Sequence, residues 1–308
     1  PQQWKSTSRF PRDVLFMTKN PYLKKCGMVD FDGICSIATF VMRSKDESVL
    51  LQEYLALVMQ TDDVWNYLEA NKSGSVNYFI TWKTLEKYEF ELPSLEKQKE
   101  LAEIVWQFEN TRAAYEQLIV STDNLVKSQF IEMFGEPLSS SMHPVVELGK
   151  NATLINGRAY SREELLSQGK YPVLRVGNFF SNDSWYYSDM ELEEDKYCDN
   201  GDLLYAWSAS FGPKIWDGDK VIYHYHIWKI IVGNAYDKYF LFKLLEYATE
   251  EFKNQTHGST MVHLTKAGIE RTKLVVPPMA QQQSFVEFAQ QSDKSKFVIQ
   301  IAIYRDVW

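Results

Sequence analysis

The sequence predicts an α+β fold built from two repeated, β-rich domains with a long helix after each one. Three observations support this prediction. One segment occurs twice, short aromatic and β-branched runs lie between turn residues, and two long stretches have helical periodicity. The chain of 308 residues is also long enough for two domains that each bury a core of their own.

The repeat is the strongest of these observations. GSVNYFITWKTLEKYEFELPS (74–94) returns as GSTMVHLTKAGIERTKLVVPP (258–278). At a constant offset of 184 positions, identical residues align, among them Gly74 with Gly258, Thr81 with Thr265 and Gln98 with Gln282. RDVLFM (12–17) likewise resembles GDLLYA (201–206). A period this long is far beyond that of solenoid repeats and indicates a duplicated domain.

The two copies are unequal in length. About 55 residues of the second copy, from near Val145 to GDLLYA, lack a full counterpart before RDVLFM in the first. The first domain is therefore expected to be incomplete, through either a lost N-terminal part or a missing loop.

Each copy is expected to contain a β core followed by a helix. KYPVLRVGNF, GDLLYAWSA and KVIYHYHIWKIIV are typical of strands, because they are short, aromatic and β-branched. LLQEYLALVMQTDDVWNYLEAN (50–71) and KYFLFKLLEYATEEFKNQ (238–255) are typical of helices. The quoted repeat follows each helix and predicts a loop, a short helix and a strand that ends at proline.

Two long helices are predicted after the two copies. Residues 94–133 contain neither glycine nor proline, and a heptad pattern places two seams along them. The first seam is Leu101, Phe108, Tyr115 and Thr122, and the second is Ile104, Thr111, Leu118 and Leu125. The matching positions after the second copy are Phe285, Phe288, Ser292, Ile299 and Ala302. These seams predict an antiparallel coiled coil; the alternative is that each helix packs only on its own domain.

Composition limits the possible functions. The net charge of −8 provides no overall attraction to nucleic acid, so DNA binding would need local basic patches or partner proteins. Three cysteines without CxxC spacing favour a reducing compartment, and we expect the cytoplasm. No apolar run reaches the roughly 20 residues that span a bilayer, and we expect no membrane contact.

Several short motifs together resemble the specificity subunit of type I restriction–modification enzymes. ELPSLEKQKELAEIVWQFE (91–109) and VVPPMAQQQSFVEFAQQSD (275–293) are similar to the starts of that family's paired helices. ELGKNATLINGRAY (147–160) and GDLLYAWSASFGPKIWDGDKVIYHYHIWKI (201–230) are similar to parts of its target-recognition domain. The resemblance covers nearly the whole chain.

The resemblance implies a non-catalytic DNA reader with four parts. These are a first target-recognition domain at 1–93, a central spacer helix at 94–138, a second target-recognition domain at 139–278 and a distal spacer helix at 279–308. Each domain would read one half of a split double-stranded DNA target, and the paired helices would set the spacing. The implied partners are two methyltransferase subunits and the restriction/translocase subunits. S-adenosylmethionine, ATP and Mg would belong to those partners, and this chain would hold no cofactor.

Candidate DNA contacts are polar residues of the expected loops, because base edges and phosphates are recognised by paired donors and acceptors. The candidates of the first domain are Lys19, Asn20, Lys24, Lys25, Asn71, Lys72, Ser73, Ser75, Asn77 and Lys83. Those of the second are Asn156, Arg158, Tyr160, Ser161, Arg162, Arg175, Asn178, His257, Ser259, Thr260, His263 and Lys266. The Gly-Ser loops also allow backbone N–H groups to approach phosphate. Alternatively, these are ordinary solvated side chains.

Other functions fit the sequence less well. His224 and His226 share one face of an expected strand but lack a third metal ligand at suitable spacing. NPYL (20–23) lacks the second proline of an amino-methyltransferase motif, and no glycine-rich cofactor turn accompanies it. The main alternative is an assembly adaptor or scaffold protein that does not read DNA.

Overall fold

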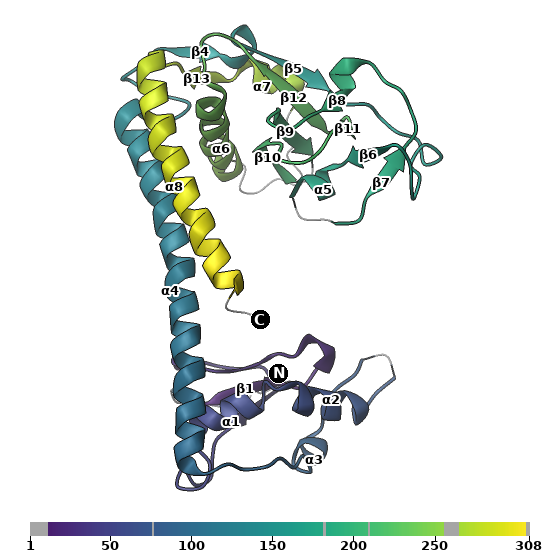
Figure 1. Cartoon of the computed structure of the whole chain (residues 1–308), viewed down its shortest axis with the longest axis vertical. Helices are drawn as coiled ribbons and strands as arrows, with labels where there is room; N and C mark the ends of the chain where they lie inside the picture. The colour runs from purple at the N-terminus through teal and green to yellow at the C-terminus, as the bar shows by residue number, and fades with distance from the viewer. Residues whose placement is uncertain (1–11, 76, 181–182, 209, 256–264, 306–308) are drawn as a thin grey trace, which may run out of the picture. The chain divides into compact units, whose positions relative to one another are not determined.

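The computed structural model describes residues 12–75, 77–180, 183–208, 210–255 and 265–305. The chain divides into two compact units, Pro1–Ala114 and Tyr115–Trp308. A single 40-residue helix, α4 (Leu95–Phe134), passes without a break from the first unit into the second (Figure 1). Among the described helices, none is both long enough and apolar enough to cross a membrane.

The first unit contains a small antiparallel sheet, with strands in the order β2-β1-β3. Its elements are β1 (Val14–Met17), η1 (Pro21–Leu23), β2 (Cys26–Met28), β3 (Thr39–Met42), α1 (Gln52–Val58), α2 (Asp62–Ala70), α3 (Trp82–Leu85) and the start of α4. Alternate residues of β1 face the helices, as the period of a strand requires. Val14 and Phe16 are fully buried, and the Phe16 ring stacks on Trp65 of α2 at 5.1 Å between centroids.

The second unit contains two four-stranded sheets, in the orders β10-β9-β12-β5 and β7-β6-β11-β8, and a pair β13-β4. Its strands are β4 (Val145–Glu147), β5 (Ala152–Asn156), β6 (Tyr171–Leu174), β7 (Tyr186–Ser188), β8 (Tyr197–Cys198), β9 (Leu203–Ser208), β10 (Ser210–Ile215), β11 (Val221–Tyr223), β12 (Ile227–Val232) and β13 (Lys273–Val275). Its helices are η2 (Leu148–Lys150), α5 (Val176–Phe180), η3 (Glu194–Lys196), α6 (Lys238–Gln255), α7 (Lys266–Arg271) and α8 (Met279–Arg305).

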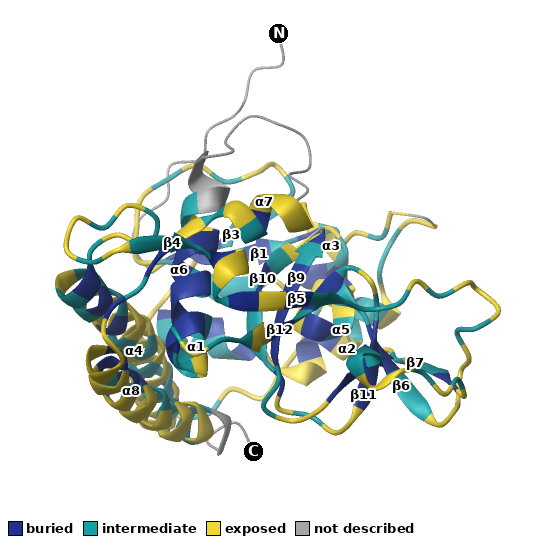
Figure 2. Cartoon of the chain, turned by 90° about the horizontal axis from the view of Figure 1, so that it is seen from above, coloured by how far each residue is buried: buried dark blue, intermediate teal, exposed yellow. Residues whose placement is uncertain are grey.

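Strand β9 lies between two cores of the second unit and is buried on both faces (Figure 2). Leu203 and Tyr205 belong to a large core that also includes Phe240 of α6 and Phe285 of α8. Leu204 and Ala206 point the other way, into a core shared with the second sheet. This double burial explains why the β9 sequence is almost uniformly apolar instead of alternating.

The duplication predicted from the sequence is visible in local geometry. Thr81 and Thr265 each begin a short helix, and each side-chain oxygen accepts a hydrogen bond at 3.1 Å, from the N–H groups of Thr84 and Gly268. β1 and β3 of the first unit correspond to β9 and β12 of the second. Both pairs are antiparallel. Met17 of β1 lies opposite Thr39, the first residue of β3, and Ala206 of β9 lies opposite Ile227, the first residue of β12.

The two copies differ in the sheets that the structure describes. The described part of the first unit has a three-stranded sheet, without a counterpart of β5 and without the second sheet formed by β6, β7, β8 and β11. The helix predicted for residues 50–71 is also wrong in one respect, since it is divided into α1 and α2. Thr61 is extended at the break, and Asp62 and Asp63 begin the new helix, where their charges favour the helix N-terminus.

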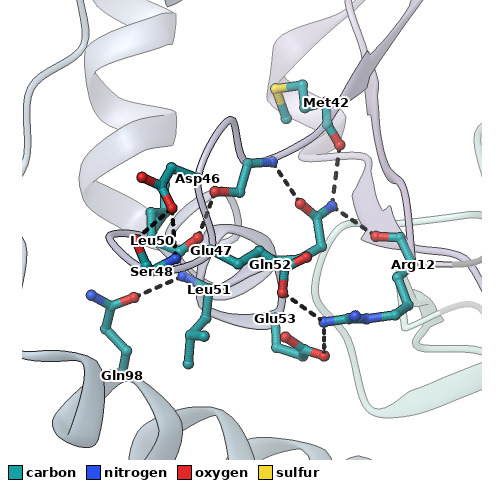
Figure 3. A network of polar contacts seen from close by, with 11 residues as sticks. Arg12, Met42, Asp46, Glu47, Ser48, Leu50, Leu51, Gln52, Glu53 and Gln98 are labelled. Atoms are coloured by element: carbon teal, nitrogen blue, oxygen red, sulfur yellow. Dashed lines mark hydrogen bonds and ion pairs between the residues drawn. The ribbon is translucent and has the colours of Figure 1, made fainter.

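The first long helix, α4, is joined to its domain through a buried glutamine, Gln98 (Figure 3). In the first unit Gln98 is fully buried, and its side-chain amide donates to the carbonyl oxygens of Val49 (2.9 Å) and Pro93 (2.8 Å). Its side-chain oxygen accepts from the N–H group of Leu51 at 3.0 Å. Nearby, Arg12 forms ion pairs with Glu47 (3.3 Å) and Glu53 (2.5 Å).

In the second unit α4 and α8 lie side by side and antiparallel (Figures 1 and 2). The Phe285 ring lies 5.4 Å from Phe130 and 5.7 Å from Phe134, measured between centroids. Lys296, further along α8, forms an ion pair with Asp123, which is earlier on α4. α8 also packs on its own domain, since Phe285 contacts Phe240 of α6 at 6.0 Å. The two helices therefore pair as expected, and α8 packs on its own domain as well.

One predicted seam of α4 is wrong. The first seam (Leu101, Phe108, Tyr115, Thr122) is half-buried, but Ile104, Thr111, Leu118 and Leu125 are exposed. The buried positions instead recur every four residues near both ends of the helix, at Gln98 and Ala102 and at Val126, Phe130 and Phe134. A period of four suits a helix that packs on a globular domain, whereas a coiled-coil seam alternates three and four.

Candidate nucleic-acid interface

A polar pocket of about 330 Å³ opens in the second unit, where the turn between β11 and β12 meets α5. It is lined by Arg175, Val176, Gly177, Asn178, Ser184, Tyr186, His224 and His226. Arg175 and Asn178 are two of the DNA contacts predicted from the sequence. Among the described residues that line this pocket there is no carboxylate, and the guanidinium of Arg175 is their one permanent charge.

Both predicted residues are held in position by the surrounding fold. Arg175 immediately precedes α5, and its guanidinium lies over the Tyr186 ring, 5.2 Å from the centroid. This cation–π contact orients a planar donor group without neutralising it. The side-chain amide of Asn178 donates to the carbonyl oxygen of Ser184 at 2.8 Å. This hydrogen bond joins two residues that both line the pocket, Asn178 and Ser184.

The two histidines lie in a tight turn, whereas the sequence predicted a strand. His224 directly follows β11 and His226 follows Tyr225 at the tip, with 4.7 Å between the histidine ring centroids. Burial, reinforced by His226 and by the positive charge of Arg175, lowers the pKa of His224 from 6.5 to about 4. A neutral His224 has one donor and one acceptor nitrogen. Among the described residues no group of three or more His, Cys, Asp or Glu side chains could hold a metal ion.

Sequence reasoning did not identify His224, His226 and Tyr186 as members of this site. The indole N–H of Trp207 donates to the carbonyl oxygen of Tyr225 at 2.9 Å, and its ring contacts His226 at 4.9 Å between centroids. The dense aromatic and histidine content of YHYHIW was the available signal, but it did not show which segments the turn would meet.

The NGRAYSR segment is committed largely to internal contacts. The Arg158 guanidinium donates two hydrogen bonds to Glu164, at 2.7 and 2.9 Å. These bonds lower the pKa of Glu164 from 4.5 to about 2. The Tyr160 hydroxyl is buried, and desolvation raises its pKa. Asn156 is half-buried, and its carbonyl oxygen accepts from Lys196 at 3.2 Å. The two remaining predicted residues of the segment, Ser161 and Arg162, are exposed.

The predicted Gly-Ser loop of the second copy lies outside the described residues, and with it His257, Ser259, Thr260 and His263. Lys266, the last predicted residue there, is exposed in the first turn of α7, with its amine 3.8 Å from the Glu270 carboxylate.

In the first unit the structure brings together two groups of predicted residues that are distant in sequence. Phe79 forms backbone bridges with both Lys19 and Ser73, and the Asn20 N–H donates to the carbonyl oxygen of Tyr78 at 2.9 Å. The Gly74 φ is +97°, and a Cβ there would lie 2.5 Å from the Asn77 carbonyl oxygen. This turn therefore requires glycine.

The remaining predicted residues of the first unit are mostly on its surface. Lys24 forms an ion pair with Asp62 (2.6 Å), while Lys72 forms one with Glu69 and lies over the Tyr78 ring. The exposed members are Lys19, Lys24, Lys25, Asn71, Ser75, Asn77 and Lys83. The unit thus presents exposed amines and amides beside the paired segments 18–20 and 78–80.

Two sequence segments match the family described as Type I restriction modification DNA specificity domain, at residues 11–120 and 143–303. These matches coincide with the two copies of the repeat and cover most of the chain. The chain belongs to this family. The first match runs into α4 as far as residue 120, and the second includes nearly all of α8.

Curated and solved relatives agree with this assignment. The chain is 25% identical over 145 residues to the Type I restriction enzyme EcoBI specificity subunit of Escherichia coli. That match covers 46% of this chain and 30% of the relative, so the chain spans less than a third of that protein's length in this comparison.

Two solved structures share the fold. One comes from a study of complex assembly and conformational transition of the type I R-M system, with a TM-score of 0.62, 19% identity, and coverage of 99% of this chain and 80% of that one. The other is the type I restriction–modification S subunit from M. genitalium, with a TM-score of 0.55, 14% identity, and coverage of 98% and 81%. At these identities the likeness establishes the fold of two domains with helical spacers.

Proposed function

We propose that this specificity-family chain reads a split DNA target, one half-site with each domain, and carries out no chemistry itself. The observation that supports this most directly is that the DNA specificity domain matches twice, once on each copy. A duplicated reader fits a target with two separate parts, because each domain can bind its own stretch of duplex.

In the second domain the proposed reader is the Arg175 pocket. A guanidinium fork pairs with the O6 and N7 atoms of guanine in the major groove, and the amide of asparagine pairs with adenine. Arg175 is oriented by Tyr186, and the described lining of the pocket offers no carboxylate to compete for it. By contrast, Arg158 already has both arms of its fork on Glu164. Arg175 is therefore the stronger candidate for base recognition.

The long helices are proposed to set the distance between the half-sites. A 40-residue helix such as α4 extends about 60 Å, which is more than one turn of B-DNA. Its second half is stiffened by the antiparallel contact with α8, through Phe285 and the Lys296–Asp123 ion pair.

The partners are proposed to be two methyltransferase subunits, which would supply S-adenosylmethionine, and ATP-driven restriction/translocase subunits that use Mg. With a net charge of −8, this chain attracts the phosphate backbone poorly. We therefore expect weak DNA binding by the isolated chain and tight binding once the methyltransferase subunits surround the duplex.

A DNA mobility-shift assay across a range of salt concentrations, with and without the methyltransferase subunits, distinguishes this proposal from the adaptor alternative. A reader should lose affinity steeply as salt rises, because each phosphate contact releases a counterion. Two results would favour an adaptor. One is an assembly that binds DNA equally well whatever its sequence, and the other is DNA binding that does not require this chain.

A further inference from the structure

The two units contain an equivalent turn with an exposed apolar side chain at its tip. In the first unit the turn precedes β3 and consists of Ser36, Ile37 and Ala38. In the second it precedes β12 and consists of His224, Tyr225 and His226. Ile37 is 85% exposed and Tyr225 is 37% exposed.

The hydrogen bonds of the turns establish their equivalence. In each unit a residue at the end of the neighbouring strand donates its N–H to the carbonyl oxygen of the third turn residue. In the first unit Thr18, which directly follows β1, donates to Ala38 at 2.8 Å. In the second unit Trp207, near the end of β9, donates to His226 at 3.0 Å. The first residue of the next strand donates back across the turn. These bonds run from Thr39 to Ser36 at 3.0 Å and from Ile227 to His224 at 2.9 Å.

A single exposed apolar side chain on a protein surface needs no explanation. Here the same position is apolar and exposed in both copies, although the turn sequences Ser-Ile-Ala and His-Tyr-His have no residue in common. Turn tips usually carry Gly, Asn, Asp or Ser, whose side chains interact well with water and with the turn backbone. A large apolar group at both tips therefore indicates a shared contact.

The surroundings of both tips favour nucleic acid as that contact. Tyr225 lies between the two pocket histidines, next to the site that holds Arg175. In the first unit the exposed Lys19 directly follows Thr18, which anchors the turn through both its N–H and its hydroxyl (2.8 and 2.9 Å to Ala38 O). Each tip is thus on a turn that backbone hydrogen bonds fix. A cationic residue belongs to the neighbouring structure in both cases, Lys19 next to the anchoring Thr18 and Arg175 in the pocket that the two histidines line.

We propose that Ile37 and Tyr225 act as wedges that insert between base pairs, one in each half-site. Apolar side chains on fixed elements unstack a base step and kink the duplex, and aromatic side chains stack on the exposed base. The base step that each wedge opens would lie within reach of Lys19 in the first domain and of Arg175 in the second. This inference rests on the proposed reading of DNA by both domains.

The test uses the full chain assembled with its methyltransferase subunits, on duplexes that carry the methylated motif. Single adenines are replaced by 2-aminopurine, whose fluorescence rises when a base unstacks. We expect one bright position in each half-site. Ile37→Ser should abolish one signal and Tyr225→Ser the other, each with about a tenfold loss of affinity. Tyr225→Leu should keep its signal, because an aliphatic wedge is sufficient at the other tip.

Matched controls are Ile34→Ser in the loop before the first turn and Ile231→Ser on β12, since both residues are exposed, at 74% and 47%. Both should leave signal and affinity unchanged.

If the unaltered assembly binds its motif without a bright position, or if both wedge variants bind as tightly as the unaltered chain, the wedges are wrong but DNA reading stands. If the variants fail only in capturing methyltransferase subunits, the tips are protein contacts and the inference falls. An assembly that shows no sequence-dependent binding at all would overturn both proposals.

Discussion

Gln98 and Gln282, which stand 184 positions apart, make the same three hydrogen bonds in two different domains. Each side-chain amide donates to the carbonyl oxygen of the proline five residues earlier, at 2.8 Å in both cases. Each also donates to a carbonyl oxygen just before the domain's main helix, at Val49 and Ala235, both at 2.9 Å. Each side-chain oxygen accepts an N–H two residues further on. Both glutamines are fully buried.

Replacing either glutamine should loosen the joint between a long helix and its domain. Gln98→Ala and Gln282→Ala each remove the side-chain partner of two carbonyl oxygens and one N–H. We expect each to lower the free energy of unfolding of its own unit by about 2–4 kcal/mol, measured by denaturant unfolding. The exposed neighbours Gln107 and Gln281 provide controls, and their alanine variants should be within about 0.5 kcal/mol of the unaltered chain. Equal effects of buried and exposed substitutions would contradict the role of this joint.

Arg175 should determine one base of the half-site that the second domain reads. Arg175→Ala should cost about 1–3 kcal/mol of binding to the correct motif and should relax the preference at a single base pair. Competition binding with duplexes that vary one pair at a time measures both effects. Lys273→Ala, on an exposed position of β13, is the matched loss of charge and should leave base preference intact. A uniform loss of affinity for all sequences would show that Arg175 contacts only phosphate.

The low pKa of His224 predicts a pH-dependent stability of the second unit. The unfolded histidine binds its proton near pH 6.5, whereas the folded one does so near 4. Between these values the unfolded state binds more protons, so stability should fall as the pH falls from about 6.5 to about 4. After allowance for partial exposure, we expect a loss on the order of 1–2 kcal/mol. His224→Gln should remove this part of the pH dependence in thermal unfolding, and an unchanged slope would contradict it.

The pairing of α4 with α8 can be tested by a double-mutant cycle between Phe130 and Phe285, whose ring centroids are 5.4 Å apart. Each alanine substitution should destabilise the second unit by about 3–5 kcal/mol, because both side chains are fully buried. We expect a coupling free energy of about 0.5–1.5 kcal/mol between them. Phe297 is 62% exposed on α8, and the cycle of Phe130 with Phe297 should be additive. Coupling that is the same in both cycles would argue against the pairing.

Local sequence signals were sufficient for the repeat and the long helices. The equivalence of Thr81 with Thr265 and of Gln98 with Gln282 follows from identical residues at one constant offset. The break between α1 and α2 was not predicted, although the four polar residues 60–63 interrupt the apolar pattern of residues 50–71. The second seam of α4 was wrong because a heptad pattern cannot show which neighbours cover a helix.

The pocket could not be found from the sequence, since its members come from segments almost 50 positions apart. Arg175 and Tyr186 flank α5, while His224 and His226 belong to the turn before β12. The parallel pairing of β6 with β11 and the antiparallel pairing of β6 with β7 bring these segments together. The equivalent tips at Ile37 and Tyr225 were hidden for another reason. They align at an offset of 188, outside the register of the repeat, and share no residue identity.

Mapping methylated bases across the host genome, with and without this gene, tests the reading of a split target most directly. We predict a two-part motif with a fixed gap that disappears when the gene is removed. Arg175→Ala should change the methylated sequence in only one of the two parts. A continuous, undivided motif, or methylation that does not depend on this gene, would contradict the proposal that each domain reads its own half-site.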